Sequence, residues 1–88
     1  MDNIQATVKA FILEQFLRDA NPDDLTSDTP LIAGGILDSL ATVRLAAYLE
    51  EHFGIQLEAY DVSEENLGSL EQIAALVRGR QAKGASNA

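Results

Sequence analysis

The sequence has no cysteine, no tryptophan and a single histidine among its 88 residues. Without cysteine the chain can form no disulfide, thiolate metal site or cysteine nucleophile, so its fold depends on packing alone and a cytoplasmic location fits best. With only three Phe and two Tyr, the core must be mostly aliphatic. So short a chain makes one small domain, because it cannot divide into two halves that each bury a core. Large enzyme scaffolds are therefore excluded.

Basic residues are also scarce, since six Lys and Arg face fourteen Asp and Glu and the net charge is -8. A surface with this charge repels phosphate backbones and anionic headgroups, so we expect no nucleic-acid partner and no membrane partner. No apolar run reaches the roughly 18 residues of a membrane span, and the first residues lack the basic and apolar regions of a signal peptide. The sequence therefore indicates a cytoplasmic protein, which we expect to be a monomer.

Apolar residues at helical spacing predict a first helix over residues 3–18. They are Ile4, Val8, Phe11, Ile12 and Phe16. Pro22 and the acidic pair after it end this helix, because proline disfavours helical geometry before it and removes a donor. A long loop then runs to Gly35, and its spaced apolar residues predict that it is pinned across the helices. These residues are Leu25, Leu31 and Ile32.

The second helix is predicted to begin at Asp38, whose carboxylate can cap the first turn, and to end at Gly54, which can adopt the left-handed conformation. Its core-facing stripe is Thr42, Leu45, Ala46, Leu49 and Phe53. Residues 61–66 can form only a short third helix before Gly68 breaks it.

A capping box of Ser69 and Gln72 opens the fourth helix, which we expect to end near Gly79. Its apolar face is Leu70, Ile73, Ala74 and Val77. The sequence therefore predicts an all-α domain over residues 1–79, followed by a flexible tail over residues 80–88. The predicted fold is a small four-helix bundle with a long loop between the first two helices and a short third helix.

Enzyme signatures are mostly absent. His52 is the only imidazole, and its place near the end of the second helix favours a role in capping the helix dipole. The pairs Glu50-Glu51 and Glu64-Glu65 are best interpreted as solvated charges, because adjacent residues on a helix point in different directions. A hydrolase that used Ser39 would lack a base, since His52 lies roughly 20 Å away along the helix. We therefore expect no catalytic residue and no metal site.

The segment from Gly34 to Leu40 is the strongest functional candidate. Its two glycines allow a tight turn, and Ser39 follows the Asp38 cap at the first helical position, with its hydroxyl exposed between loop and helix. A phosphate attached to Ser39 would lie beside the unpaired amides and the positive dipole end of the helix. The alternative is that Asp38-Ser39 is only a helix start.

A second apolar stripe follows helical spacing on the second helix, away from its core stripe. It consists of Leu40, Val43 and Ala47. If these residues are exposed beside Ser39, they suggest a docking surface for partner proteins. The alternative is that both stripes are buried and the helix is simply central.

The motif Asp38-Ser39-Leu40, followed by a helix that ends in Leu49-Glu50-Glu51-His52-Phe53-Gly54, resembles the acyl and peptidyl carrier protein family. The resemblance covers about residues 4–77 and is closest to free-standing aminoacyl (peptidyl) carriers. It implies that a phosphopantetheinyl transferase attaches 4′-phosphopantetheine from coenzyme A to Ser39. The thiol of this arm then holds an acyl or aminoacyl thioester. The docking residues implied are Leu37, Leu40, Val43, Arg44 and Ala47.

Two residues depart from the pattern of fatty-acid carriers, which usually have acidic residues where this sequence has Ala41 and Arg44. Residues 61–70 also look more like those of free-standing aminoacyl carriers. The resemblance therefore favours an aminoacyl cargo, loaded by an AMP-forming ligase and passed to a downstream transferase. A fatty-acid or polyketide acyl carrier is the first alternative. A helical interaction adaptor that is never modified is the second.

Overall fold

The computed structural model describes the backbone of residues 3–19 and 21–86 and the side chains of residues 3–19 and 21–81. Its elements are α1 (Asn3–Phe16), the 3-10 helix η1 (Pro22–Asp24), α2 (Ser39–Phe53), the 3-10 helix η2 (Ala59–Asp61), α3 (Glu64–Leu67) and α4 (Leu70–Ser86). Because this described part contains only helices and connections, the prediction of an all-α bundle with a long first loop and a short third helix is confirmed.

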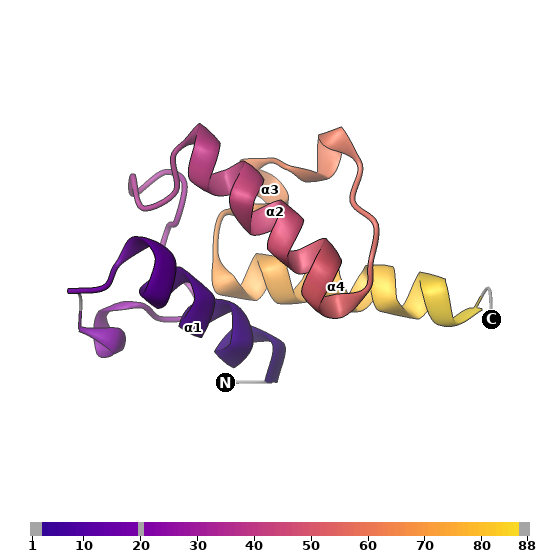
Figure 1. The fold of residues 1–88 in the computed structure, drawn as a ribbon, viewed down its shortest axis with the longest axis horizontal. Coiled ribbons are helices and arrows are strands. Elements are labelled where there is room, and N and C mark those ends of the chain that lie inside the picture. Colours follow the sequence, from indigo (N-terminus) through magenta and orange to yellow (C-terminus); the bar gives the residue numbers. More distant parts are fainter. Residues whose placement is uncertain (1–2, 20, 87–88) are drawn as a thin grey trace.

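The fourth helix is the centre of the bundle, because α4 contacts α1, α2 and α3. Figure 1 shows α4 along the long axis of the molecule, with α2 crossing it. The core between the helices is aliphatic, as the composition predicts. Its fully buried side chains include Val8, Ile12, Leu45, Leu49, Leu67, Leu70, Ile73 and Val77.

The long loop between α1 and α2 is pinned to the bundle, as predicted. Leu25 and Leu31 are buried in the core, and Ile32 packs against it. Two backbone hydrogen bonds also hold the loop near the start of α4. Leu31 N donates to Gly68 O at 2.7 Å, and Glu71 N donates to Ser27 O at 3.0 Å.

The structure differs from the prediction at the end of the first helix and over the whole of the third. The first helix ends at Phe16 and not at residue 18, a shift within the usual fraying of helix ends. The predicted third helix over residues 61–66 is instead two short elements, η2 and α3. Asp61 closes η2, because its Oδ2 accepts a hydrogen bond from Glu58 N at 2.9 Å, and Ser63 then opens α3.

The fourth helix was expected to end near Gly79, and this boundary is wrong. The structure continues α4 to Ser86, and Gly79 does not adopt a positive φ, unlike Gly54 at the end of α2. Glycine inside a helix costs only about 1 kcal/mol relative to alanine, so it does not by itself end one. The predicted start of α4 is supported, because Gln72 N donates to Ser69 Oγ at 3.2 Å.

Within the described backbone, no helix combines the length and the hydropathy that crossing a membrane requires. The flexibility expected of residues 80–88 stays a prediction.

Candidate functional site

A tight turn leads into α2, and both of its glycines are needed. Gly35 has a φ of 81°, which side-chain-bearing residues rarely adopt. A Cβ on Gly34 would lie 2.4 Å from Pro30 O, so no other residue fits there without movement. The turn is closed by two hydrogen bonds, from Gly35 N to Ile32 O at 3.1 Å and from Leu37 N to Leu31 O at 2.9 Å.

Asp38 caps α2 as predicted. Its backbone is extended (φ -84°, ψ -175°), and its Oδ1 accepts a hydrogen bond from Ala41 N at 2.8 Å. The Asp38 carbonyl accepts from Thr42 N at 2.9 Å and from Thr42 Oγ1 at 2.7 Å. These bonds fix the first turn of α2 rigidly around Ser39.

Ser39 is the first residue of α2, and its side chain is exposed. The N–H groups of Ser39 and Leu40 precede the first helical hydrogen bond, which Thr42 N makes to Asp38 O. These amides and the helix dipole therefore offer a favourable environment for a negatively charged group joined to Ser39 Oγ.

An open groove of about 550 Å³ lies beside Ser39, between the start of α2 and the segment before α3. Its lining includes Ile32, Thr42, Val43, Val62, Ser63 and Glu64. The groove therefore offers both apolar and polar contacts to a flexible chain that starts at the Ser39 hydroxyl.

The two apolar stripes of α2 lie on different faces. Leu45 and Leu49 are fully buried, whereas Leu40 is 69% exposed and Val43 is 58% exposed. Ala47 is exposed as well. The alternative that both stripes are buried is therefore wrong. The docking role of the exposed stripe stays a prediction.

Two residues beside or within the first turn of α2, Leu37 and Ala41, are buried in the core. Leu37 is only 2% exposed and packs in the core, although it also lines the groove beside Ser39. The docking role predicted for Leu37 stays a prediction. Ala41 is 8% exposed, so an acidic side chain at this position would be buried and not displayed. Ala41 therefore bears on the packing of α2 and not on the surface charge beside Ser39.

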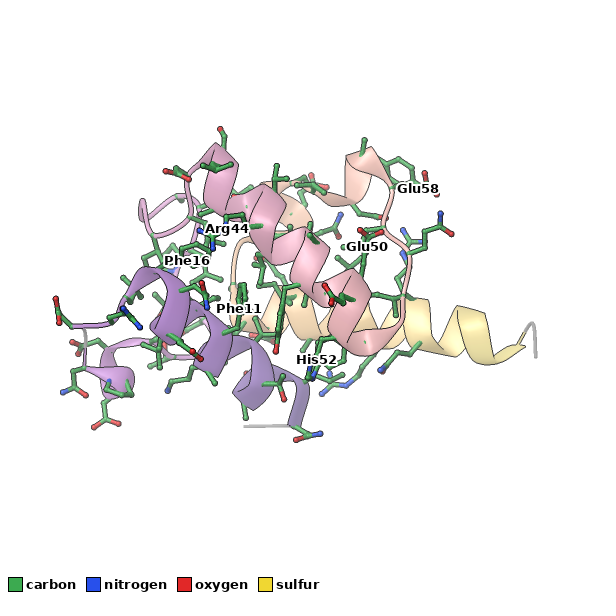
Figure 2. The ribbon with its side chains drawn as sticks, in the orientation of Figure 1. Phe11, Phe16, Arg44, Glu50, His52 and Glu58 are labelled. Carbon is green, nitrogen blue, oxygen red and sulfur yellow. The ribbon has the colours of Figure 1, made fainter. Side chains whose placement is uncertain are left out.

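Arg44 is on the surface but is held against α1. Its Nη2 donates to Gln15 Oε1 at 3.2 Å, and its guanidinium lies 5.5 Å from the centre of the Phe16 ring. Figure 2 shows Arg44 beside Phe16, at the side of α2 that faces α1. The positive charge near Ser39 is therefore located at the boundary between α1 and α2.

His52 lies in the last turn of α2, as predicted, in a row of aromatic rings. Its ring stacks on Tyr48 with 5.1 Å between centroids, and Tyr48 stacks on Phe11 at 3.9 Å. Desolvation and then the nearby Glu14 charge raise the pKa of Tyr48. Figure 2 places His52 at the C-terminal end of α2.

Of the acidic pairs, Glu50 has a structural role that its sequence position did not reveal. Its Oε2 accepts a hydrogen bond from Leu57 N at 2.9 Å and so fixes the chain that leaves α2. Glu51, Glu64 and Glu65 are exposed. Among the described side chains, no three acidic or imidazole groups gather closely enough to hold a metal ion.

Sequence reasoning missed an ion pair between Asp61 and Arg80. Asp61 is 3% exposed, and Arg80 Nη2 lies 2.6 Å from its Oδ1 and 2.5 Å from its Oδ2. The hydrogen bond to Asp61 raises the pKa of Arg80, although burial opposes this shift. No local pattern links residues nineteen positions apart.

Comparison with known proteins identifies the family. The phosphopantetheine attachment site family matches residues 10–77 of the chain. The chain belongs to this family. It is therefore a phosphopantetheine-bearing carrier protein, and the cofactor expected from the Asp38-Ser39-Leu40 motif is confirmed as that of the family.

Similar proteins agree with this assignment. The D-alanyl carrier protein of Enterococcus faecalis is 38% identical over 81 residues, which cover 90% of this chain and 99% of the relative. The expected resemblance to free-standing aminoacyl carriers is therefore confirmed. A chain in the solved structure titled "Crystal structure of FAD-dependent dehydrogenase" is 34% identical, with a TM-score of 0.71 and coverage of 80% of this carrier and 97% of that chain.

Proposed function

We propose that Ser39 bears 4′-phosphopantetheine as a phosphodiester, and that the carrier holds a small aminoacyl group on it, with D-alanine as the first candidate. The arm supplies a thiol, which this cysteine-free chain lacks, and the thiol holds the cargo as a thioester. The observation that carries the proposal is the exposed Ser39 hydroxyl at the start of α2, inside the segment that the family matches.

The chain's own residues position the modified serine. Asp38 holds the first turn of α2 in place through Ala41 N. The N–H groups of Ser39 and Leu40 lie before the first helical hydrogen bond, close to the atom that would carry the phosphate. In the attachment step Ser39 Oγ forms a bond to the phosphorus that carries the pantetheine arm, the pyrophosphate bond of coenzyme A breaks, and adenosine 3′,5′-bisphosphate leaves. The proton from Ser39 Oγ goes to a base of the transferase, because the chain's single histidine lies about 20 Å away, thirteen helical residues further on. The carrier is accordingly a substrate of other enzymes and has no catalytic residue of its own.

Three partners follow from this proposal. A phosphopantetheinyl transferase modifies Ser39, an AMP-forming ligase loads the amino acid, and a downstream transferase receives it. The phosphopantetheinyl transferase acts on Ser39 itself, and the other two act on the thiol of the arm. Leu40, Val43 and Ala47 are exposed on the helix that Ser39 begins, which supports a docking role for this face of α2. Coenzyme A and ATP are cytoplasmic substrates, so we place the carrier, as a monomer, in the cytoplasm.

The D-alanyl cargo is supported by the relative from Enterococcus faecalis, which matches nearly the whole carrier. The main alternative is a fatty-acid or polyketide cargo. Arg44 disfavours this alternative, because a guanidinium on the recognition helix repels partner enzymes that dock through basic patches.

A two-stage loading experiment tests the proposal. The carrier is first incubated with coenzyme A, magnesium and a broad-specificity phosphopantetheinyl transferase, and intact mass spectrometry should show one added arm on the unaltered chain and none on Ser39→Ala. The modified carrier is then offered D-alanine or L-alanine with ATP and an alanine-activating ligase, or malonyl-coenzyme A with a malonyl transferase.

D-alanyl loading without malonyl loading is the expected result. Modification of Ser39→Ala would overturn the attachment site, and efficient malonyl loading with no aminoacyl loading would replace the aminoacyl cargo with the acyl alternative. A Ser39 that is never modified would favour the adaptor interpretation.

A further inference from the structure

An ion pair between the partly exposed Arg80 and the buried Asp61 joins the second half of α4 to the segment that precedes α3. Asp61 is the buried carboxylate of the described side chains, and one nitrogen of Arg80, Nη2, contacts both of its oxygens at 2.6 and 2.5 Å. The same carboxylate accepts a hydrogen bond from Glu58 N at 2.9 Å. The Asp61 side chain therefore links the two ends of η2 to each other and to α4.

This contact lies directly beside one wall of the Ser39 groove. Val62 and Ser63 follow Asp61 directly, and Ser63 N donates to the Asp61 carbonyl at 3.0 Å. Val62, Ser63 and Glu64 line the groove together with Ser39 and Val43. A shift of Asp61 would therefore move the wall of the groove that Val62, Ser63 and Glu64 form.

Arg80 lies outside the segment that defines the family match, which ends at residue 77. It is present in the folded unit only because α4 continues past Gly79. If Arg80 lost its charge, the buried Asp61 carboxylate would lose this ion pair, which is strongly unfavourable. The segment would then move so that water could reach the carboxylate, and Val62 and Ser63 would move with it.

We propose that Arg80 is a positioning residue, which holds Asp61 and thereby fixes the Val62–Glu64 wall of the groove for the enzymes that load the arm on Ser39. The effect of Arg80 on the loading enzymes rests on the proposed function, because it requires an arm on Ser39 that accepts an amino acid. The structural part of the proposal, the control of the groove wall by Arg80, is independent of any modification or cargo.

The structural part is tested by amide NMR spectra of the full, unmodified chain. Arg80→Gln should shift the amides of residues 58–64 and of Val43, whereas Arg18→Gln, which removes the same charge from an exposed side chain, should leave them in place. Shifts confined to α4 would overturn the proposal.

A double-mutant cycle separates the ion pair from other effects of the substitution. Asp61→Asn with Arg80→Gln removes both charges of the ion pair, so the pair of substitutions should shift these amides less than the sum of the single variants. Additive shifts would show that Arg80 does not act through Asp61.

The functional part is tested by aminoacylation kinetics of the phosphopantetheinylated carrier. Arg80→Gln should raise the KM for the carrier by about tenfold while leaving kcat nearly unchanged, because docking is impaired and the thiol is not. The matched control is Val8→Ala, which weakens the core at a fully buried position in α1.

If a loss of stability were enough to raise the KM for the carrier, both Arg80→Gln and Val8→Ala would raise it. An equal rise in KM for Val8→Ala, or an unchanged KM for Arg80→Gln, would overturn the positioning role. If the unaltered carrier accepts no amino acid, the proposed cargo fails, and the NMR comparison still decides whether Arg80 controls the groove wall.

Discussion

The two faces of α2 predict opposite effects for substitutions at Val43 and Leu49. Val43 is 58% exposed, so about two-fifths of its surface is buried, and Val43→Asp loses the stabilisation from burying this apolar fraction. Full burial of valine stabilises a protein by about 1.5–3 kcal/mol, so this loss is worth roughly 1 kcal/mol. Valine and aspartate have similar helix propensities, which adds little. The free energy of unfolding should therefore fall by about 1 kcal/mol or less.

Leu49→Ala is the matched core substitution on the same helix. Leu49 is fully buried, and its truncation leaves a cavity, so the free energy of unfolding should fall by about 2–5 kcal/mol. Urea unfolding followed by circular dichroism measures both values, and unchanged urea m-values would show that the unfolded states are comparable.

The rate of Ser39 modification is the second measurement. Here Val43→Asp should have the larger effect and Leu49→Ala the smaller one, the reverse of their effects on stability. Val43→Asp should lower kcat/KM for modification of Ser39 by about tenfold, whereas Leu49→Ala should load normally at a temperature where it is folded. A stability loss for Val43→Asp within the Leu49→Ala range would show that Val43 is packed. Normal loading of a stable Val43→Asp would refute the docking role.

Two further predictions concern Arg44 and Tyr48. Arg44→Glu removes the contacts with Gln15 and the Phe16 ring and should lower the free energy of unfolding by about 1 kcal/mol. In the loading experiment with the alanine-activating ligase and the malonyl transferase, malonyl loading should rise and aminoacyl loading should fall. Unchanged selectivity would show that this charge plays no part in partner choice. Tyr48 should ionise above its usual pKa of 10.0, because burial and Glu14 disfavour the phenolate. The unfolded chain then releases this proton first, so stability should fall as the pH rises through 10, which phenolate absorbance and alkaline unfolding can follow.

The features near Ser39 could be predicted because they depend on local geometry. A capping carboxylate acts on amides within one turn, so Asp38 was identifiable from its position before an apolar series. The separation of Val43 from Leu49 follows from the helical repeat, which places them on different faces.

Features that depend on tertiary contacts were missed or misplaced. Leu37 precedes the helix, so no helical repeat indicates its direction, and its burial follows from the turn that brings its N–H to Leu31 O. Ala41 is adjacent to both stripes, and only the packing of the loop decides that it is buried. Asp61 and Arg80 meet because η2 folds back over α4, which no sequence pattern reports.

The charges around Ser39 have a consequence for how partners dock. The exposed Leu40 and Val43 lie between an acidic side, where Glu64 lines the groove, and a basic side, where Arg44 is held against α1. An apolar centre alone would allow a partner to dock in more than one orientation. With opposite charges on its two sides, the reversed orientation would bring like charges together, which costs free energy and slows association. If partners dock on this face, we therefore expect Arg44 to bear on the orientation in which a partner's active site meets Ser39, and not only on the class of partner.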